Sequence, residues 1–224
     1  MKIAEIFYSV QGEGALVGVP SVFVRTSGCN LRCVWCDTPY TSWEPEGEEL
    51  GLDEIMARVD AYDAARHVVV TGGEPMIAPQ IVELTERLRS RGLHITVETA
   101  GTVYKLVQCD LMSISPKLAH STPPGKWSAT HERLRIQPET LCRLMDGFEY
   151  QLKFVVAGPD DLSEIGALIE QLKADRSKVI LMPEGIDREA LRERGSWVAE
   201  VCKREGFRFS PRLHVELYGN RRGT

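Results

Sequence analysis

The sequence predicts an α/β fold built on an open, mainly parallel sheet that forms a partial barrel. Short apolar runs alternate with helical periods along the chain, and the runs themselves show little polar alternation. Six such runs in 224 residues are too few for a closed eight-stranded barrel of the usual length. At 43% hydrophobic and 26% charged residues, the chain has the composition of a single globular domain covering 1–224.

The predicted strands are rich in β-branched and other apolar residues. Nearly continuous apolar runs favour strands that are covered on at least one face. Since helical segments separate them, the order implies parallel pairing through right-handed crossovers. The strands are 21–26 (SVFVRT), 67–71 (HVVVT), 94–98 (HITVE), 111–115 (LMSIS), 150–156 (YQLKFVV) and 178–183 (KVILMP).

Two of the intervening segments, 52–62 and 162–172, carry one apolar stripe at helical spacing and are predicted helices. By contrast, 117–138 has no clear period and holds three prolines. We expect a long loop there, and a long loop in a compact domain often has a function, such as that of a lid.

Two further helices are predicted from the residues at their ends. Pro79 suits the first turn of a helix that runs to about Arg91, where Gly92 would stop it. Asp187 can cap a helix that ends near Gly206.

The charge and hydropathy of the chain exclude several classes of partner. The formal net charge of -5 gives no general attraction to nucleic acid or to an anionic membrane. Residues 1–10 lack the apolar region of a signal peptide, and no apolar run approaches the ~20 residues of a membrane span. We therefore expect a cytoplasmic protein with a small-molecule ligand.

Three of the six cysteines, Cys29, Cys33 and Cys36, lie within eight residues in the spacing C-x3-C-x2-C. Such clustering indicates metal rather than disulfides, and thiolates are the ligands of iron–sulfur clusters. With three thiolates, a [4Fe–4S] cluster keeps one iron open, and that iron can bind the amino and carboxylate groups of S-adenosylmethionine (SAM). The other three cysteines stand alone and are interpreted as small buried hydrophobes.

The alternative interpretation of this loop is a structural zinc site in a protein without catalysis. Zinc of that kind takes four closed ligands. Asp37 is the nearest candidate for the fourth, but its adjacency to Cys36 makes tetrahedral closure awkward. His67 or His94 could serve only if the fold brought them near.

Several motifs resemble those of a known superfamily. The cysteine spacing with Trp35 before the last cysteine, and 71–75 (TGGEP), resemble the radical SAM superfamily. More narrowly, five blocks in order along the chain resemble the 7-carboxy-7-deazaguanine synthase family. The blocks are 5–20 (EIFYSVQGEGALVGVP), 36–38 (CDT), 98–101 (ETAG), 115–117 (SPK) and 210–214 (SPRLH).

This resemblance implies a partial (β/α)6 barrel with a [4Fe–4S] cluster, SAM and Mg2+, usually as a homodimer. It implies a radical ring contraction that converts 6-carboxy-5,6,7,8-tetrahydropterin to 7-carboxy-7-deazaguanine and ammonia, in queuosine and 7-deazapurine biosynthesis. An external one-electron donor, such as a flavodoxin or a ferredoxin, would reduce the cluster. The sequence indicates no dedicated acid–base pair.

The resemblance also implies which residues grip the pterin. Read alone, 11–14 (QGEG) is a turn, and an arginine in the apolar strand 21–26 needs an anionic partner. That partner is either a structural carboxylate or the substrate carboxylate, and the resemblance favours the substrate, which suits a bidentate guanidinium. The implied substrate residues are Val10, Gln11, Gly12, Glu13, Arg25 and Thr71.

For the cofactors, the resemblance implies contacts from the cysteine loop and from two strand ends. Thr38 would ligate Mg2+, and because one hydroxyl is a weak ligand, substrate oxygens and water would complete the octahedron. Gly72 and Gly73 would hold the methionyl amine, while Glu98 and Thr99 would line the SAM site. The implied SAM residues are Trp35, Asp37, Gly73, Ser115, Pro116 and Lys117.

Some points stay open at this stage. Lys153, a cation in an apolar strand, is given an active-site role without an assignment. The tail 215–224 (VELYGNRRGT) either closes the pocket or projects as a basic tip. All the site residues follow or lie near the C-terminal ends of strands, where barrel enzymes build their sites. The competing enzyme class is a glycyl-radical activating enzyme, against which QGEG, Arg25 and SPRLH argue.

Overall fold

A computed structural model describes all of residues 1–224, and its centre is one nine-stranded sheet in the order β3-β1-β2-β4-β5-β6-β7-β8-β9. The six predicted strands are β2 and β4 to β8, and they pair in parallel as predicted. The open, partial-barrel fold class is thereby confirmed. The bounds are β1 Lys2–Val10, β2 Pro20–Thr26, β3 Glu48–Glu49, β4 His67–Gly72, β5 His94–Thr99, β6 Leu111–Ile114, β7 Tyr150–Val156, β8 Val179–Pro183 and β9 Arg208–Phe209.

Strand β1 was not among the predicted strands. Lys2 and Glu5 interrupt its apolar residues, so it lacks the continuous run of the central strands. It pairs with β2 in antiparallel fashion, with Val10 opposite Pro20. The turn that follows β1 therefore lies at the end of this hairpin opposite to the cysteine loop, which follows β2.

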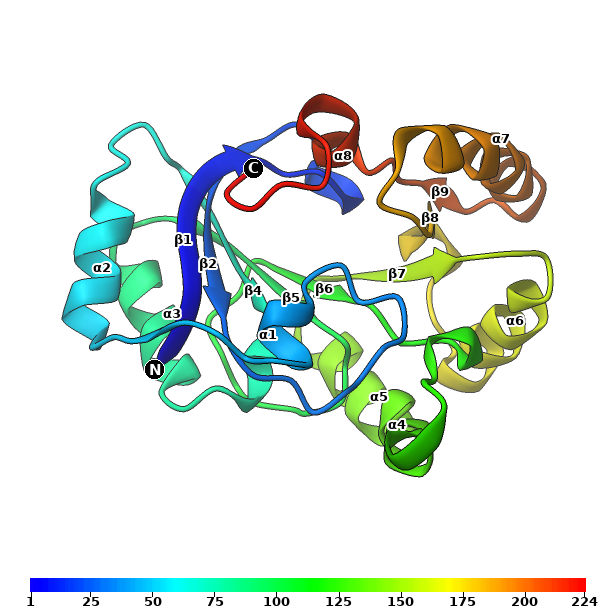
Figure 1. The fold of residues 1–224 in the computed structure, drawn as a ribbon, viewed down its shortest axis with the longest axis horizontal. Helices are drawn as coiled ribbons and strands as arrows, with labels where there is room; N and C mark the ends of the chain where they lie inside the picture. The colour runs from blue at the N-terminus through cyan, green and yellow to red at the C-terminus, as the bar shows by residue number, and fades with distance from the viewer.

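Five longer helices lie on the outer face of the sheet (Figure 1). One cluster of 39 buried residues forms the core. The two predicted stripes are buried in α2 and α6, which confirms both helices. None of the helices combines the length and the apolar character needed to cross a membrane. The five helices are α2 Leu52–Asp60, α3 Ile81–Ser90, α5 Pro138–Gly147, α6 Asp161–Leu172 and α7 Arg188–Glu205, and the shorter ones are α1 Pro39–Ser42, α4 Ser128–Arg135 and α8 Leu213–Tyr218.

The predicted helix ends hold for α7 and are wrong at the start of α3. The Asp187 side chain accepts hydrogen bonds from the amides of Glu189 and Ala190, at 2.9 and 3.1 Å, and Gly206 ends the helix at φ +71°. Helix α3 begins after Pro79, because Gln80 adopts a left-handed conformation at φ 59°.

The expectation of a long loop over 117–138 is wrong. The segment contains two 3-10 turns, Ala119–Ser121 and Gly125–Trp127, followed by α4. Helix α4 buries only His131, so it has no apolar stripe by which the sequence could have indicated it.

Candidate active site

One cavity of about 440 Å3 opens between the cysteine loop, the inner face of the sheet and the C-terminal residues. Every candidate site residue except Pro116 lines it. Pro116 is buried beside the cavity, because side chains alternate in direction at the extended end of β6. The candidates in the wall are Val10, Gln11, Gly12, Glu13, Arg25, Cys29, Cys33, Trp35, Cys36, Asp37, Thr38, Thr71, Gly73, Ser115 and Lys117.

Strand direction places these residues on two sides of the cavity. The site residues follow or lie near the C-terminal ends of strands, as expected, but the end of β1 lies at the opposite edge of the sheet, because β1 is antiparallel to β2. The turn after β1 instead crosses to the other half of the sheet. The amide of Ala15 donates to Gln151 in β7 at 2.7 Å, and that of Gly14 donates to Ser210 at 2.8 Å. The cavity thus lies between this turn and the cysteine loop, since residues of both line it.

The three clustered cysteines are free thiols on one loop and line the same cavity. Leu31, Cys33 and Ala100 form a small apolar cluster, and the other two cysteines pack against it. Burial raises the pKa of Cys29 to about 12 and that of Cys33 to about 11. Anionic sulfur in this setting needs cationic partners, so the donor set fits an iron–sulfur cluster with three protein thiolates.

The candidates for a fourth zinc ligand lie elsewhere. His67 and His94 begin β4 and β5, with ring centroids 4.6 Å apart, at the sheet edge opposite to the cysteine loop. Asp37 is engaged by Arg212. Nowhere do three or more His, Cys, Asp or Glu side chains gather closely enough to hold a single metal ion.

The segment that was expected to be a loop supports the cysteine loop. The amide of Arg32 donates to His131 Nδ1 at 3.1 Å, and the amide of Val34 donates to the Ser121 carbonyl at 2.9 Å. His131 Nε2 lies 2.9 Å from the Ser121 hydroxyl. Burial lowers the pKa of His131, which favours the neutral ring that accepts at Nδ1 and donates at Nε2.

In the TGGEP segment, close packing accounts for a glycine, and the glutamate is a buried acid that bonds to the next strand. A Cβ on Gly73 would lie 2.3 Å from the Gly28 carbonyl oxygen, so only glycine fits. Glu74 is fully buried and accepts from the Thr99 hydroxyl and the Ala100 amide, both at 2.8 Å. It therefore ties the ends of β4 and β5 together, a role that the sequence analysis did not assign.

The candidate SAM residues form a compact group beside the cysteines. Lys117 Nζ donates to the carbonyl and hydroxyl oxygens of Ser115, at 2.8 and 2.9 Å, and lies 5.9 Å from the Trp35 ring centroid. The Trp35 ring stacks on His120, and its Nε1 is buried without a hydrogen-bond partner. An unpaired buried donor at the wall of a cavity suits a site that is completed by a ligand.

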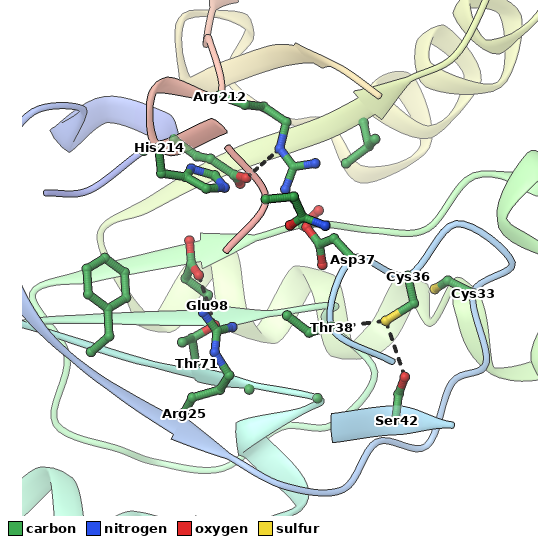
Figure 2. A pocket seen from close by; sticks show the side chains of 18 of the residues that line it. Arg25, Cys33, Cys36, Asp37, Thr38, Ser42, Thr71, Glu98, Arg212 and His214 are labelled. Carbon is green, nitrogen blue, oxygen red and sulfur yellow. Dashed lines mark hydrogen bonds and ion pairs between the residues drawn. The ribbon is translucent and has the colours of Figure 1, made fainter. Parts of the chain in front are cut away.

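Arg212 connects the two sides of the cavity (Figure 2). It is 7% exposed, and its Nε lies 3.0 Å from Glu13 Oε1. Its other nitrogens donate to Asp37, on the cysteine loop, and to the Gly185 carbonyl at 2.6 Å. Burial would raise the pKa of both carboxyls, but the guanidinium and, for Glu13, Lys153 hold it below the usual range.

The ion pairs continue from Glu13 into the sheet. Lys153 pairs with Glu13 and lies 3.6 Å from Glu98 Oε1. Burial alone would lower the pKa of Lys153, but the two carboxylates raise it. The hydroxyl of Thr71 donates to Glu98 at 2.9 Å. The unassigned Lys153 is therefore a link in a buried chain of charges along the cavity.

Arg25 pairs with a carboxylate of the protein, which is one of the two partners that the sequence left open. Its Nε donates to Glu5 Oε1 at 2.7 Å, and the Tyr40 hydroxyl donates to the same oxygen. The two Nη nitrogens have no protein hydrogen-bond partner. The guanidinium lies 5.7 Å from the centroid of Phe7, whose ring stacks on Phe23 in the cavity wall.

The C-terminal tail lies along the cavity and does not project as a basic tip. Residues 220–224 line the cavity. Arg222 pairs with Glu46 at 2.8 Å and covers the Tyr40 ring at 3.6 Å. Thr38 lies in the same wall, where its hydroxyl accepts from Thr41 at 3.3 Å.

Sequence reasoning missed the roles of Arg212 and His214, although it singled out the SPRLH motif. A Cβ on Gly12 would lie 1.9 Å from His214 Nδ1, and the Leu213 amide donates to the Gly12 carbonyl at 2.9 Å. The start of α8 is thus packed on the QGEG turn. The available signal was an arginine and a histidine inside a motif that the family resemblance had already singled out.

The comparisons with known proteins agree with this geometry. Residues 23–150 match the Radical SAM superfamily. A 7-carboxy-7-deazaguanine synthase of Halobacterium salinarum is 46% identical, over 98% of this chain and 91% of that protein. One of Rhodopirellula baltica is also 46% identical, over 100% of this chain and 89% of that protein. The crystal structure of QueE from Escherichia coli superposes with a TM-score of 0.71 at 26% identity, covering 95% of this chain and 94% of that one. The chain therefore belongs to the radical SAM superfamily and, within it, to the 7-carboxy-7-deazaguanine synthase family.

Proposed function

We propose that this enzyme converts 6-carboxy-5,6,7,8-tetrahydropterin to 7-carboxy-7-deazaguanine and ammonia, in the biosynthesis of queuosine and other 7-deazapurines. The observation that carries the proposal is one cavity in which the three-cysteine loop faces the QGEG turn. Its relatives in two organisms bear the name of this synthase over nearly the whole chain.

The radical SAM family uses a [4Fe–4S] cluster and SAM. Cys29, Cys33 and Cys36 would hold the cluster, and when bound the two cofactors supply one-electron cleavage of SAM and abstraction of a substrate hydrogen. The chain positions the ligands: Trp35 and Lys117 would flank SAM, and the residues around Arg222 line the cavity.

For the pterin, the cavity offers a flat wall and complementary polar groups. The stacked rings of Phe7 and Phe23, at 4.9 Å, suit a planar heterocycle. Glu13, held anionic, would accept hydrogen bonds from the amino and amide edge, with Gln11 oriented by its bond to Ser21 at 3.0 Å. The free nitrogens of Arg25 would bind the substrate carboxylate.

The remaining features are proposed from the resemblance. Thr38 would contribute one ligand to Mg2+, with substrate oxygens and water supplying the others, so Mg2+ would bind poorly without substrate. The enzyme would act as a homodimer and take electrons from a flavodoxin or a ferredoxin. Six free cysteines suit the reducing cytoplasm.

The test is product formation by the anaerobically reconstituted protein with dithionite, SAM, Mg2+ and 6-carboxytetrahydropterin, followed by mass spectrometry. We expect 7-carboxy-7-deazaguanine, lost in Cys33→Ala and retained in Cys142→Ala, which alters a cysteine outside the cavity. Formation of 5′-deoxyadenosine without that product would refute the pterin assignment. A colourless protein loaded with zinc would refute the radical assignment as well.

A further inference from the structure

The sulfur of Cys36 has a hydrogen-bond partner that the sequence analysis did not assign. The Ser42 hydroxyl lies 3.2 Å from Cys36 Sγ, and this is the only hydrogen bond of that hydroxyl (Figure 2). Ser42 is 2% exposed, so solvent does not compete for the contact. Because sulfur bound to iron carries no proton, the hydroxyl is then the donor. Ser42 therefore points a proton at one of the three thiolates.

The short helix α1 holds this hydroxyl in place. A serine in a helix often bonds back to the carbonyl one turn earlier, which for Ser42 is that of Thr38. The Thr41 hydroxyl already donates to this carbonyl at 2.9 Å, and Ser42 faces the sulfur instead. On the other side of Ser42, the indole of Trp43 donates to the carbonyl of Cys33 at 3.0 Å. The fold thus fixes α1 against the cysteine loop at both neighbours of Ser42.

The three cluster sulfurs differ in the hydrogen bonds that they accept. Cys29 Sγ accepts from the Leu31 amide at 3.3 Å, which is a backbone bond. The other side chain near Cys36 Sγ is that of Thr38, whose hydroxyl lies at 3.9 Å. Ser42 therefore provides the shortest hydrogen bond from a side chain to any of the three sulfurs.

Hydrogen bonds to the sulfurs are among the factors that set the reduction potential of an iron–sulfur cluster. Reduction by one electron makes the sulfurs more negative, and a donated proton stabilises the added charge. Cys36 also packs against the apolar cluster that contains Leu31 and Ala100, where a low local dielectric strengthens such a bond. The bond from Ser42 should therefore stabilise the reduced state more than the oxidised state.

We propose that Ser42, through its hydrogen bond to Cys36 Sγ, raises the reduction potential of the cluster that the three cysteines hold. The electron comes from a low-potential donor, which is oxidised by one electron. Ser42 keeps its proton, so no proton moves with the electron. The inference rests on the cluster of the radical SAM superfamily and does not depend on the pterin substrate.

The test is a redox titration of the anaerobic holoenzyme, monitored by EPR of the reduced cluster. In Ser42→Ala, the equilibrium constant for one-electron reduction should fall roughly three- to tenfold, which is about 30–60 mV at 59 mV per tenfold change. Ser163→Ala removes an exposed hydroxyl from α6 and is the matched control, for which we expect an unchanged potential.

A second measurement tests the hydrogen bond directly. Pulsed EPR of the reduced enzyme in H2O and in D2O should reveal an exchangeable proton that is coupled to the cluster and is missing from Ser42→Ala. A serine that only supports the fold would change the iron content and leave the potential of the loaded protein unaltered. Equal potentials in Ser42→Ala and Ser163→Ala would therefore overturn the proposal. A lowered potential in Ser42→Ala, with no 7-carboxy-7-deazaguanine from the unmodified enzyme, would instead refute the proposed function and support this inference.

Discussion

Replacing Arg212 by methionine removes the cation that joins the two sides of the cavity. The guanidinium is 7% exposed and bonds to Glu13, Asp37 and the Gly185 carbonyl. Without it, Glu13 keeps Lys153, but Asp37 loses its ion-pair partner. Removing one partner of a fully buried ion pair lowers the unfolding free energy by about 3–5 kcal/mol. The Asp37 side chain is 38% exposed, so solvent screens part of its charge, and we expect a loss of about 2–4 kcal/mol. For a chain of this length, that corresponds to a fall in Tm of roughly 4–16 °C.

Thermal and urea unfolding of the anaerobic holoenzyme measure this change. Arg212→Lys keeps the positive charge but not the forked guanidinium, so its unfolding free energy should fall less than that of Arg212→Met. Arg204→Met breaks an exposed pair with Glu205 and should change the unfolding free energy by less than about 1 kcal/mol. If the unfolding free energy of Arg212→Met falls no more than that of Arg204→Met, the argument that the ion pairs hold the site together is refuted.

The pH dependence provides a second readout. The folded pKa values of Glu13 and Asp37 are depressed, so both carboxyls add stability above their ordinary values of 4.5 and 3.8. That stability is lost as the pH falls, because the unfolded chain then binds protons that the folded chain does not. In Arg212→Met the folded pKa of Asp37 rises toward its ordinary value, so the loss of stability as the pH falls from about 5 to about 2 should be shallower.

Three further predictions address other parts of the fold. Gly73→Ala forces a Cβ to within 2.3 Å of a carbonyl oxygen and should cost about 1–3 kcal/mol in urea unfolding, whereas Gly158→Ala, which meets no atom within 4 Å, should be neutral. His131→Leu should lower the iron retained after gel filtration and His131→Gln should restore part of it; equal iron in both would count against a supporting hydrogen bond. Burial and His94 lower the pKa of His67 in the folded chain, so the unfolded chain binds a proton more readily, and stability should fall as the pH drops below the ordinary value of 6.5. An equally steep fall in stability in His67→Gln would contradict this.

The strands were predictable where burial on both faces leaves a continuous apolar run, as in β7 and β8. Strand β1 was not predicted, because it is only partly covered and carries Lys2 and Glu5. Helix α4 was not predicted, because its one buried side chain is a histidine and it therefore has no apolar stripe at helical spacing. In both cases the element is fixed by tertiary contacts more than by local pattern.

The residues of the site were predictable from motif order, but their arrangement was not. Glu13 meets Lys153 across 140 positions of sequence and Arg212 across 199. These contacts depend on the reversed direction of β1, which carries the QGEG turn to the far side of the cavity. A single sequence states neither the direction of an edge strand nor which buried cation faces which carboxylate.

The chain of buried charges places stability and activity in opposition. Glu13, Asp37 and Glu98 face the buried cations Arg212 and Lys153 along the cavity wall, and apolar residues of similar volume would cost the fold less. The charges provide position, because the ion pairs hold Glu13 and Asp37 in place, with their pKa values lowered, before a ligand arrives. Replacing Arg212, Glu13 and Asp37 together by apolar residues should therefore recover much of the stability lost in Arg212→Met. It should not recover product formation, because the groups that face the ligands would be gone.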